Sequence, residues 1–227
     1  MNDIAEATVA RGSSSRTEVA TAEEPGASAT PASEARSRTD TRARIQQIAV
    51  ELFSEHGYEG TSLREIAEHL GVTKAALYYH FKSKEDIILS LVEDYQAQMD
   101  ALIGWAREHP GNADTRREIL NRYMQIVAER SQVFRMLHQN QAALNTMASA
   151  LRTLKAAPLQ LADQLAGPGA SLRERARVMM ALGAMSVGWM YLADQVSDRD
   201  ELSEIVCGIA NELVGCLPPA TVSSGSE

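Results

Sequence analysis

The chain has 227 residues, of which 44% are hydrophobic and 23% charged, so a core of ordinary globular size can form. Its net charge of −8 argues against indiscriminate binding to nucleic acid or anionic membranes. A local basic patch is still compatible with that total, because charges act over only about 8–10 Å in physiological salt. Residues 178–193 carry no charge but fall short of the roughly 20 residues that span a bilayer, so we expect a cytoplasmic protein without membrane contact.

Both ends of the chain read as disordered tails. Residues 1–38 are rich in Ala, Ser, Thr and Glu, and they lack a helical apolar stripe, strand alternation and the apolar run of a signal peptide. Such a segment buries too little apolar surface to offset the entropy of ordering it. The same composition recurs in residues 218–227.

The sequence between the tails has helical periodicity almost throughout, so we expect an all-α fold. Ile45, Ile48 and Leu52 follow the spacing of a first helix, which Gly57 ends. We divide this region into a helix-turn-helix domain at 39–86 and a larger helical effector-binding and dimerisation domain at 87–217.

Two short helices and the start of a long one follow. Ser62 and Glu65 have the spacing of a capping box at the start of the second helix, which Gly71 ends. A third helix begins near Thr73, and Ser83 with Asp86 marks the start of a long helix. Further helices are predicted at about 114–130, 131–144, 146–165, 171–195 and 199–216, and the sequence is punctuated by Asn112, Pro158, "GPG" at 167–169 and Asp198.

The segment "GVTKAALYYHFKSKEDI" at 71–87 carries the strongest functional signal. Two helices joined by "GVT" form a helix-turn-helix, which presents its second helix to the major groove. At 100° per residue Leu77 and Phe81 share the inner side, while Lys74, Ala75, Tyr78 and Tyr79 spread over the outer sides. Lysine can donate to guanine, alanine can contact a thymine methyl group, and tyrosine can reach phosphate or base edges.

The local charge balance does not by itself favour this interpretation. Residues 40–86 contain six basic and eight acidic side chains, a net charge of −2. The interpretation therefore requires the lysines to cluster at one corner. Ser83 and Lys84 would add a helix N-terminus and an ammonium group there, which together suit a phosphate.

The block "TSLREIAEHLGVTKAALYYHFKSKEDI", preceded by "RIQQIAVELFSEHGYEG", resembles the DNA-binding domain of the tetracycline-repressor (TetR) family over roughly residues 41–88. The resemblance implies a homodimer on a double-stranded DNA operator, with a ligand-binding and dimerisation domain after the DNA-binding helices. It assigns DNA contacts to Thr61, Ser62, Arg64, Thr73, Lys74, Ala75, Ala76, Tyr78, Tyr79, His80, Lys82 and Lys84.

The C-terminal part contains many large side chains that suit an adaptable apolar pocket, although each of them alone is more often ordinary core. Only the resemblance makes a pocket for a small-molecule effector expected as a whole. The candidate lining residues are Trp105, Tyr123, Phe134, Met136, His138, Met147, Met180 and Trp189.

The last two predicted helices carry more apolar surface than one subunit can cover. The helix at 171–195 is apolar nearly all round after Arg177, and the next helix has a stripe that includes Leu202, Ile205 and Ile209. Two such pairs meeting across a two-fold axis would form a four-helix bundle. A dimer of this kind would place two recognition helices about 34–36 Å apart and predicts a palindromic operator.

We therefore expect a homodimeric repressor that a small-molecule ligand releases from its operator. An activator of the same fold and a helical protein-interaction module that does not read DNA remain alternatives. An enzyme is disfavoured because the histidines show no defensible catalytic pairing, and no catalytic residue, metal site or cofactor is expected. These histidines are His56, His69, His80, His109 and His138.

Overall fold

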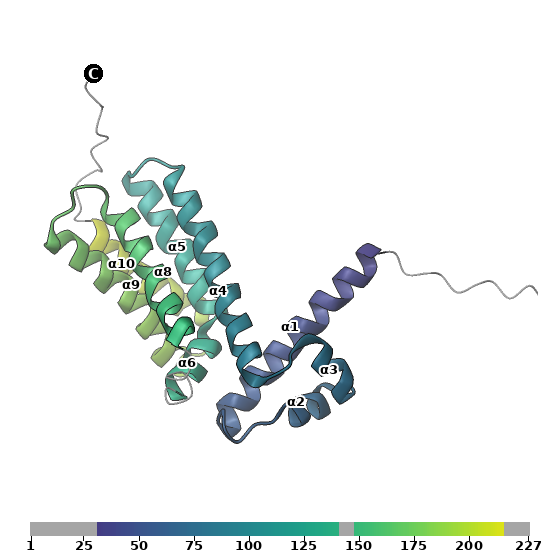
Figure 1. Ribbon diagram of the computed structural model, residues 1–227. Coiled ribbons are helices and arrows are strands. Elements are labelled where there is room, and N and C mark those ends of the chain that lie inside the picture. Colours follow the sequence, from purple (N-terminus) through teal and green to yellow (C-terminus); the bar gives the residue numbers. More distant parts are fainter. Residues whose placement is uncertain (1–30, 141–147, 216–227) are drawn as a thin grey trace, which may run out of the picture.

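The computed structural model describes residues 31–140 and 148–215, and within these ranges it consists of nine α-helices without a strand (Figure 1). The expected all-α fold is thus confirmed. Most of the two predicted tails, residues 1–30 and 216–227, lies outside the described residues. None of the described helices combines the length and apolarity needed to cross a bilayer.

The helices closely follow the ranges predicted from periodicity. Their bounds are α1 Pro31–His56, α2 Leu63–Leu70, α3 Lys74–His80, α4 Lys84–Arg107, α5 Ala113–Glu129, α6 Ser131–Gln139, α8 Ala148–Ala166, α9 Leu172–Leu192 and α10 Arg199–Gly215. Helix α6 ends at Gln139, five residues before the predicted end, and the chain that follows it lies outside the described range.

Helix α1 begins earlier than the sequence pattern suggested. Its first residue is Pro31, so the helix extends into the segment 31–38 that we expected to be an irregular tail. Proline suits the first helical position, and the following "ASEAR" contains strong helix formers. Local propensity therefore extends the helix beyond the part that has an apolar stripe.

The N-terminal helices α1, α2 and α3 enclose a small core of their own. Ile45 and Phe53 of α1, Ile66 of α2 and Leu77 of α3 are fully buried in it. This core continues past residue 86, because Ile88 and its neighbours at the start of α4 belong to the same cluster. In Figure 1 these helices form the smaller lobe, and α4 leads from it into the larger bundle.

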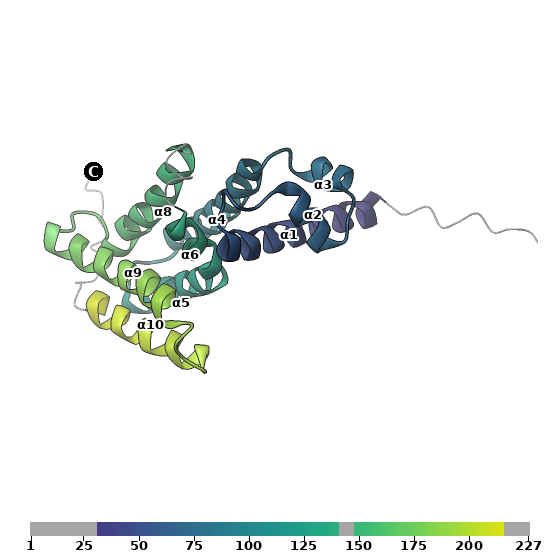
Figure 2. The same ribbon diagram turned by 90° about the horizontal axis from the view of Figure 1, so that it is seen from below.

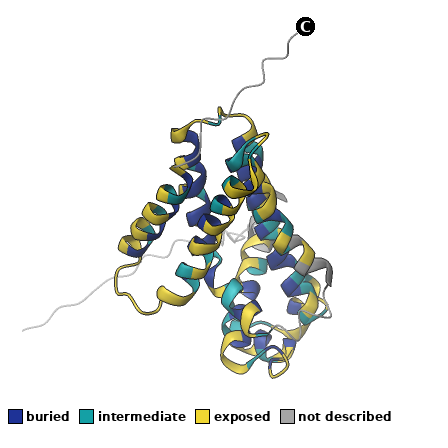
Figure 3. Cartoon of the chain, turned by 90° about the vertical axis from the view of Figure 1, so that its left-hand side faces the viewer, coloured by how far each residue is buried: buried dark blue, intermediate teal, exposed yellow. Residues whose placement is uncertain are grey.

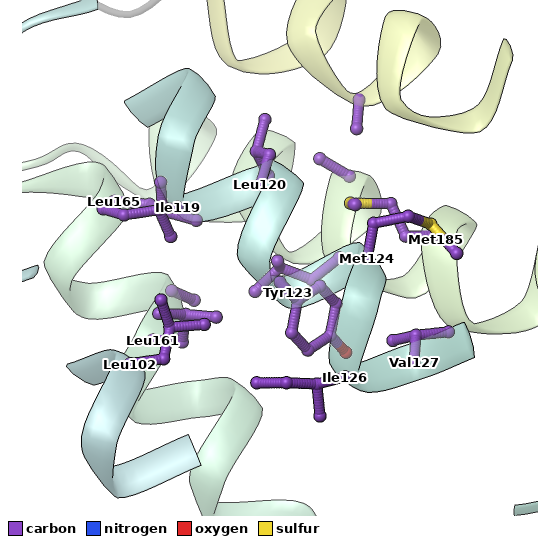
Figure 4. Close-up of a cluster of buried hydrophobic side chains, with 14 of the residues drawn as sticks. Leu102, Ile119, Leu120, Tyr123, Met124, Ile126, Val127, Leu161, Leu165 and Met185 are labelled. Atoms are coloured by element: carbon purple, nitrogen blue, oxygen red, sulfur yellow. The ribbon is translucent and has the colours of Figure 1, made fainter. Parts of the chain in front are cut away.

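The larger bundle is built from α4, α5, α8, α9 and α10, as the view in Figure 2 makes clear. Helix α4 belongs to both cores, since Ile88 and Leu91 pack in the N-terminal cluster while Tyr95, Met99 and Leu102 pack in the C-terminal one. Figure 4 shows the side chains of α4, α5, α8 and α9 converging in this second core. A displacement of α4 is therefore felt by both units.

Pro158 lies inside α8, as the predicted helix range of 146–165 implied. Proline has no backbone N–H, so the carbonyl of Leu154, four residues earlier, loses its usual helical partner. Both residues line the same pocket, which is described below. The tertiary packing of α8 against α4 and α9 outweighs the cost of the proline in this helix.

Helices α9 and α10 expose apolar side chains on their outer side, as the burial colours of Figure 3 illustrate. On α10 the predicted stripe divides: Leu202 and Val206 are buried against α9, whereas Ile205 and Ile209 are about half exposed. The exposed large apolar residues of α9 and α10 are Leu172, Met179, Met180, Val187, Tyr191, Leu192, Ile205 and Ile209. We call Met180, Val187, Tyr191, Ile205 and Ile209 the outer apolar face.

The turn at Gly71 yields a stability prediction with a built-in control. Gly71 has φ +71°, and an added Cβ would meet no atom within 4 Å, so Gly71→Ala should cost only conformational energy, about 1–2 kcal/mol. Gly104→Ala, in the interior of α4 and equally unobstructed, should instead stabilise the protein by about 0.5–1 kcal/mol. Urea unfolding of both variants checks this, and equal effects would contradict it.

Candidate DNA-binding surface and apolar pocket

The turn between α2 and α3 fixes the direction in which α3 leaves. Gly71 adopts the left-handed conformation, and Val72 N–H donates to Ala67 O at 3.0 Å across the turn. Thr73 then caps α3, its hydroxyl oxygen accepting from Ala76 N–H at 3.1 Å. Both helix ends are thus satisfied within the turn, which is the arrangement that "GVT" predicted.

Helix α3 turns one side into the core and the other to solvent. Leu77 is fully buried, and Phe81, which follows the helix, is also buried. Tyr79 is 70% exposed and Tyr78 is 40% exposed, an unusual exposure for two large aromatic side chains. The remaining outward residues of the helix, all exposed, are Lys74, Ala75 and Ala76.

Tyr58 supports the start of α4 from beneath this surface. Its hydroxyl donates to the Glu85 carboxylate at 2.6 Å, and the Lys84 ammonium donates to its carbonyl oxygen and lies 4.3 Å from its ring centroid. The hydrogen bond from Tyr58 lowers the pKa of Glu85, and burial of the ring raises the pKa of the Tyr58 phenol. Lys84, predicted as a phosphate contact, is therefore held against Tyr58 in this structure.

The predicted contacts around α3 differ in accessibility. Thr61 is buried, and its hydroxyl donates to the carbonyls of Leu52 and Gly57, so its side chain does not reach the outer surface. Ser62 and Lys82 are exposed. The other residues of this group are Thr73, which is exposed, and His80, which is half-buried and whose ring contacts that of Tyr79 edge-on at 5.3 Å.

Arg64 is exposed, and its guanidinium pairs with Glu68 at 2.7 Å. Both side chains of this pair are well exposed, so water screens the interaction, and the ion pair restrains the guanidinium only weakly.

Arg42 was not among the predicted contacts, but its guanidinium lies 5.0 Å from the Phe81 ring centroid, at the end of α3. The spacing of residues in the sequence does not reveal that Arg42 lies near the end of α3; only the structure does.

Several acidic residues of this unit are held by partners inside it, away from the exposed side of α3. Glu65 contacts His56 at 2.8 Å, and Asp86 accepts from the backbone N–H groups of Lys82 and Ser83. Glu65 therefore does not close the reciprocal capping box predicted with Ser62, whereas Ser83 and Asp86 at the start of α4 do form one. Because α3 itself contains no acidic residue, its exposed side keeps the positive charge of Lys74.

A pocket of about 310 Å³ lies between α4, α5, α6, α8 and α9. It is lined by Tyr95, Tyr123, Phe134, Leu137, His138, Leu154, Pro158, Ser186, Val187 and Met190. Sequence reasoning identified Tyr123, Phe134 and His138 as lining residues but missed the others. Tyr95 was predicted on the inner stripe of the long helix, yet nothing in the spacing distinguished a pocket position from a core position.

The other predicted pocket residues do not line this cavity. Met136 is fully buried in the N-terminal core, and Trp189 is buried in the C-terminal one. Met180 is 65% exposed on the outer apolar face, and Trp105 stacks on His109 at 4.0 Å between ring centroids. Met147 lies outside the described residues. The side of its helix on which a residue lies decides whether it reaches a core, the pocket or the surface, because large apolar side chains occur in all three places.

An exposed short helix that follows a left-handed turn and carries lysine and two tyrosines has the geometry of the second helix of a helix-turn-helix motif. Residues 45–91 match the family described as "Bacterial regulatory proteins, tetR family". The chain is 39% identical over 83 residues to the HTH-type transcriptional regulator AcrR of Shigella flexneri, a match covering 36% of this chain and 39% of the relative. It is 35% identical over 65 residues to the HTH-type transcriptional repressor AcnR of Corynebacterium glutamicum, covering 29% and 35% respectively. Both matches thus span well under half the length of the curated relatives.

Solved structures extend the similarity to the fold of most of the chain. A TetR-family regulator, PfmR of Thermus thermophilus, superposes with a TM-score of 0.61 at 22% identity, covering 77% of this chain and 99% of that one. A TerR/AcrR-family regulator of Aquifex aeolicus gives a TM-score of 0.60 at 22% identity, covering 74% and 96%. Residues 45–91 thus match the TetR family, and the fold of most of the chain is that of these two solved regulators.

The contact between Tyr58 and Glu85 predicts a pH-dependent stability difference. Tyr58→Phe keeps the ring but removes the donor, and should cost about 1 kcal/mol at pH 7, since water partly screens the exposed carboxylate. Because this bond lowers the pKa of Glu85, its contribution is present above the unfolded pKa of about 4.3 and is lost as pH falls through the folded value.

Denaturant unfolding of Tyr58→Phe at pH 7 and at acidic pH measures this difference directly. The exposed Tyr79→Phe serves as the matched control and should stay within about 0.5 kcal/mol of the parent protein. If the free energy of unfolding of Tyr58→Phe stays equally far below that of the parent protein at acidic pH, the result would argue against the hydrogen bond between Tyr58 and Glu85.

Proposed function

We propose that the chain is a homodimeric transcriptional repressor that binds a palindromic DNA operator and is released from it by a small-molecule ligand. The observation that carries this proposal is the outward presentation of α3, with Tyr79 70% exposed above a buried Leu77. The printed name of the Corynebacterium relative, a repressor, favours repression over activation. Action on genomic DNA would place the protein in the cytoplasm.

In this proposal α3 enters the major groove. Lys74, Tyr78 and Tyr79 reach base edges or the nearby backbone, while the small side chains of Ala75 and Ala76 let the helix approach the groove floor. Ser62, Arg64, Thr73, His80 and Lys82 flank α3 and are assigned to supporting contacts, mainly with phosphates. Lys84 could join them only by leaving the Tyr58 ring, and the buried Thr61 hydroxyl is not assigned a contact.

The outer apolar face supports the proposed dimer. Met180, Val187 and Tyr191 of α9 and Ile205 and Ile209 of α10 are between 49% and 65% exposed. Pairing two such faces across a two-fold axis would bury them in a four-helix arrangement. The dimer would also set the separation of the two α3 helices, which a palindromic operator must match.

The proposed release mechanism works through α4 and α6, which connect the pocket with the N-terminal core. Tyr95 of α4 and Phe134 of α6 line the pocket in an edge-on contact at 5.1 Å, while Met136 of α6 is buried in the N-terminal core. Asn140, which follows α6, accepts from Tyr58 N–H at 2.9 Å. A ligand that favours one position of these helices would shift α3 only by its differential affinity for the two states.

Removing the Tyr79 side chain tests DNA recognition. Tyr79→Ala should reduce binding to the operator by at least about tenfold, because an exposed groove contact is lost, while circular dichroism and thermal unfolding stay unchanged. Gel-shift titration against the protein's own promoter region measures the affinity. Leu159→Ala, which truncates another large exposed side chain outside the N-terminal unit, should bind as the parent does. Unchanged affinity in Tyr79→Ala would oppose the assignment.

A charge placed on the outer apolar face tests the dimer. Ile209→Glu should shift sedimentation from dimer toward monomer, because two-fold symmetry brings two unpaired carboxylates into an apolar contact. Ala97→Glu, at an exposed position of α4 away from that face, should leave the sedimentation coefficient unchanged. A variant at residue 209 that remains fully dimeric would show that this face is not the interface.

A further inference from the structure

The pocket between α4, α5, α6, α8 and α9 has an uncharged lining. Its ten described lining residues include no Asp, Glu, Lys or Arg, and His138, the one histidine among them, is exposed. An ionic ligand would lose its hydration here without meeting a countercharge. The lining therefore favours a neutral ligand.

The two buried tyrosines of the pocket indicate the same preference. Removal from water is the main cause that raises the pKa of both the Tyr95 and the Tyr123 phenol. Both hydroxyl groups consequently stay protonated at neutral pH and act as neutral hydrogen-bonding groups.

The direction of one hydrogen-bond chain can be worked out from its end. Ser186 hydroxyl donates to Leu182 O at 3.1 Å, so its single proton is used. The contact of 2.7 Å between the Tyr123 and Ser186 hydroxyls then has Tyr123 as the donor. The Tyr123 oxygen, drawn in red in Figure 4, keeps lone pairs that can accept a hydrogen bond from a ligand.

Tyr95 offers the complementary donor. The residue is only 3% exposed, and its hydroxyl forms no hydrogen bond within the part of the chain that the structure describes. Because Tyr95 lines the pocket, a ligand that pairs with this hydroxyl gains a hydrogen bond. Because Tyr95 and Tyr123 line one pocket, a single ligand group could accept from the first and donate to the second. A hydroxyl does both without carrying charge.

The volume limits the size of the ligand. At about 310 Å³ the pocket lies at the small end of the range of roughly 300–1,000 Å³ for small-molecule sites. We propose that it binds a compact, mainly apolar compound of one or two rings whose single hydroxyl is held between Tyr95 and Tyr123. This assignment rests on the ligand-responsive function proposed above and specifies the chemical class of the ligand.

Three naphthalene probes of similar size test the proposal by calorimetry on the full chain. 2-Naphthol can accept and donate, 2-methoxynaphthalene can only accept, and 2-naphthoate carries a charge. We expect one 2-naphthol to bind per chain about tenfold more tightly than 2-methoxynaphthalene, and 2-naphthoate to bind most weakly. Equal or tighter binding of 2-naphthoate, or no binding of 2-naphthol to the folded protein, would overturn the proposal.

Two single-atom variants locate the hydroxyl. Tyr123→Phe should weaken 2-naphthol about tenfold and leave 2-methoxynaphthalene within about twofold, which also shows that the cavity is intact. Tyr95→Phe should weaken both probes, since both accept a hydrogen bond. An unaltered 2-naphthol affinity in either variant would refute the assigned pairing. Operator binding by the same preparations distinguishes the ligand class from the proposed function. If the protein binds its operator but not 2-naphthol, only the ligand class is rejected. If it does not bind an operator, the proposed function is rejected.

Discussion

The burial of Leu77 and Phe81 is the constraint on which the DNA-binding surface depends. Helix α3 has seven residues, and an isolated helix of that length is not stable in water. Its stability comes from these two side chains, each worth about 1.5–3 kcal/mol on burial, and from the N-cap at Thr73. Since both anchors lie on one side of the helix, Tyr79 must face solvent.

The same logic connects the two units of the chain. Helix α4 contributes Ile88 and Leu91 to one core and Tyr95 to the other, while α6 contributes Met136 to the first core and Phe134 to the pocket. Closely packed cores move as units rather than deform continuously. The pocket and α3 therefore share rigid elements, and this sharing is the physical basis for ligand control in the proposed function. The start of α4 thus packs in the N-terminal core, while the domain division at residue 86 stays a prediction.

Much of the N-terminal unit could be predicted from sequence because its signals are local. The turn at Gly71, the cap at Thr73 and the helical phase of Leu77 each act within a few residues. The burial of Thr61 and the position of Lys84 on the Tyr58 ring could not be predicted in this way, since each depends on a partner distant in the sequence.

The pocket was harder to predict for a related reason. Large apolar side chains occur in the pocket, in the core and on the outer surface. Tyr123 lines the pocket, Trp189 is buried in the core and Met180 is exposed. Only spatial convergence distinguishes them. Pro158 shows that a strong local helix-breaking residue can be tolerated inside a helix when that helix packs on its neighbours, as α8 does.

Selection of DNA from a random pool by the purified protein tests the central claim most directly. Two outward α3 helices on a symmetric dimer should enrich an inverted repeat whose half-site centres lie about 10–10.5 base pairs, or a multiple of that, apart. Recovery of no common sequence at a salt concentration where the protein is folded would contradict the account.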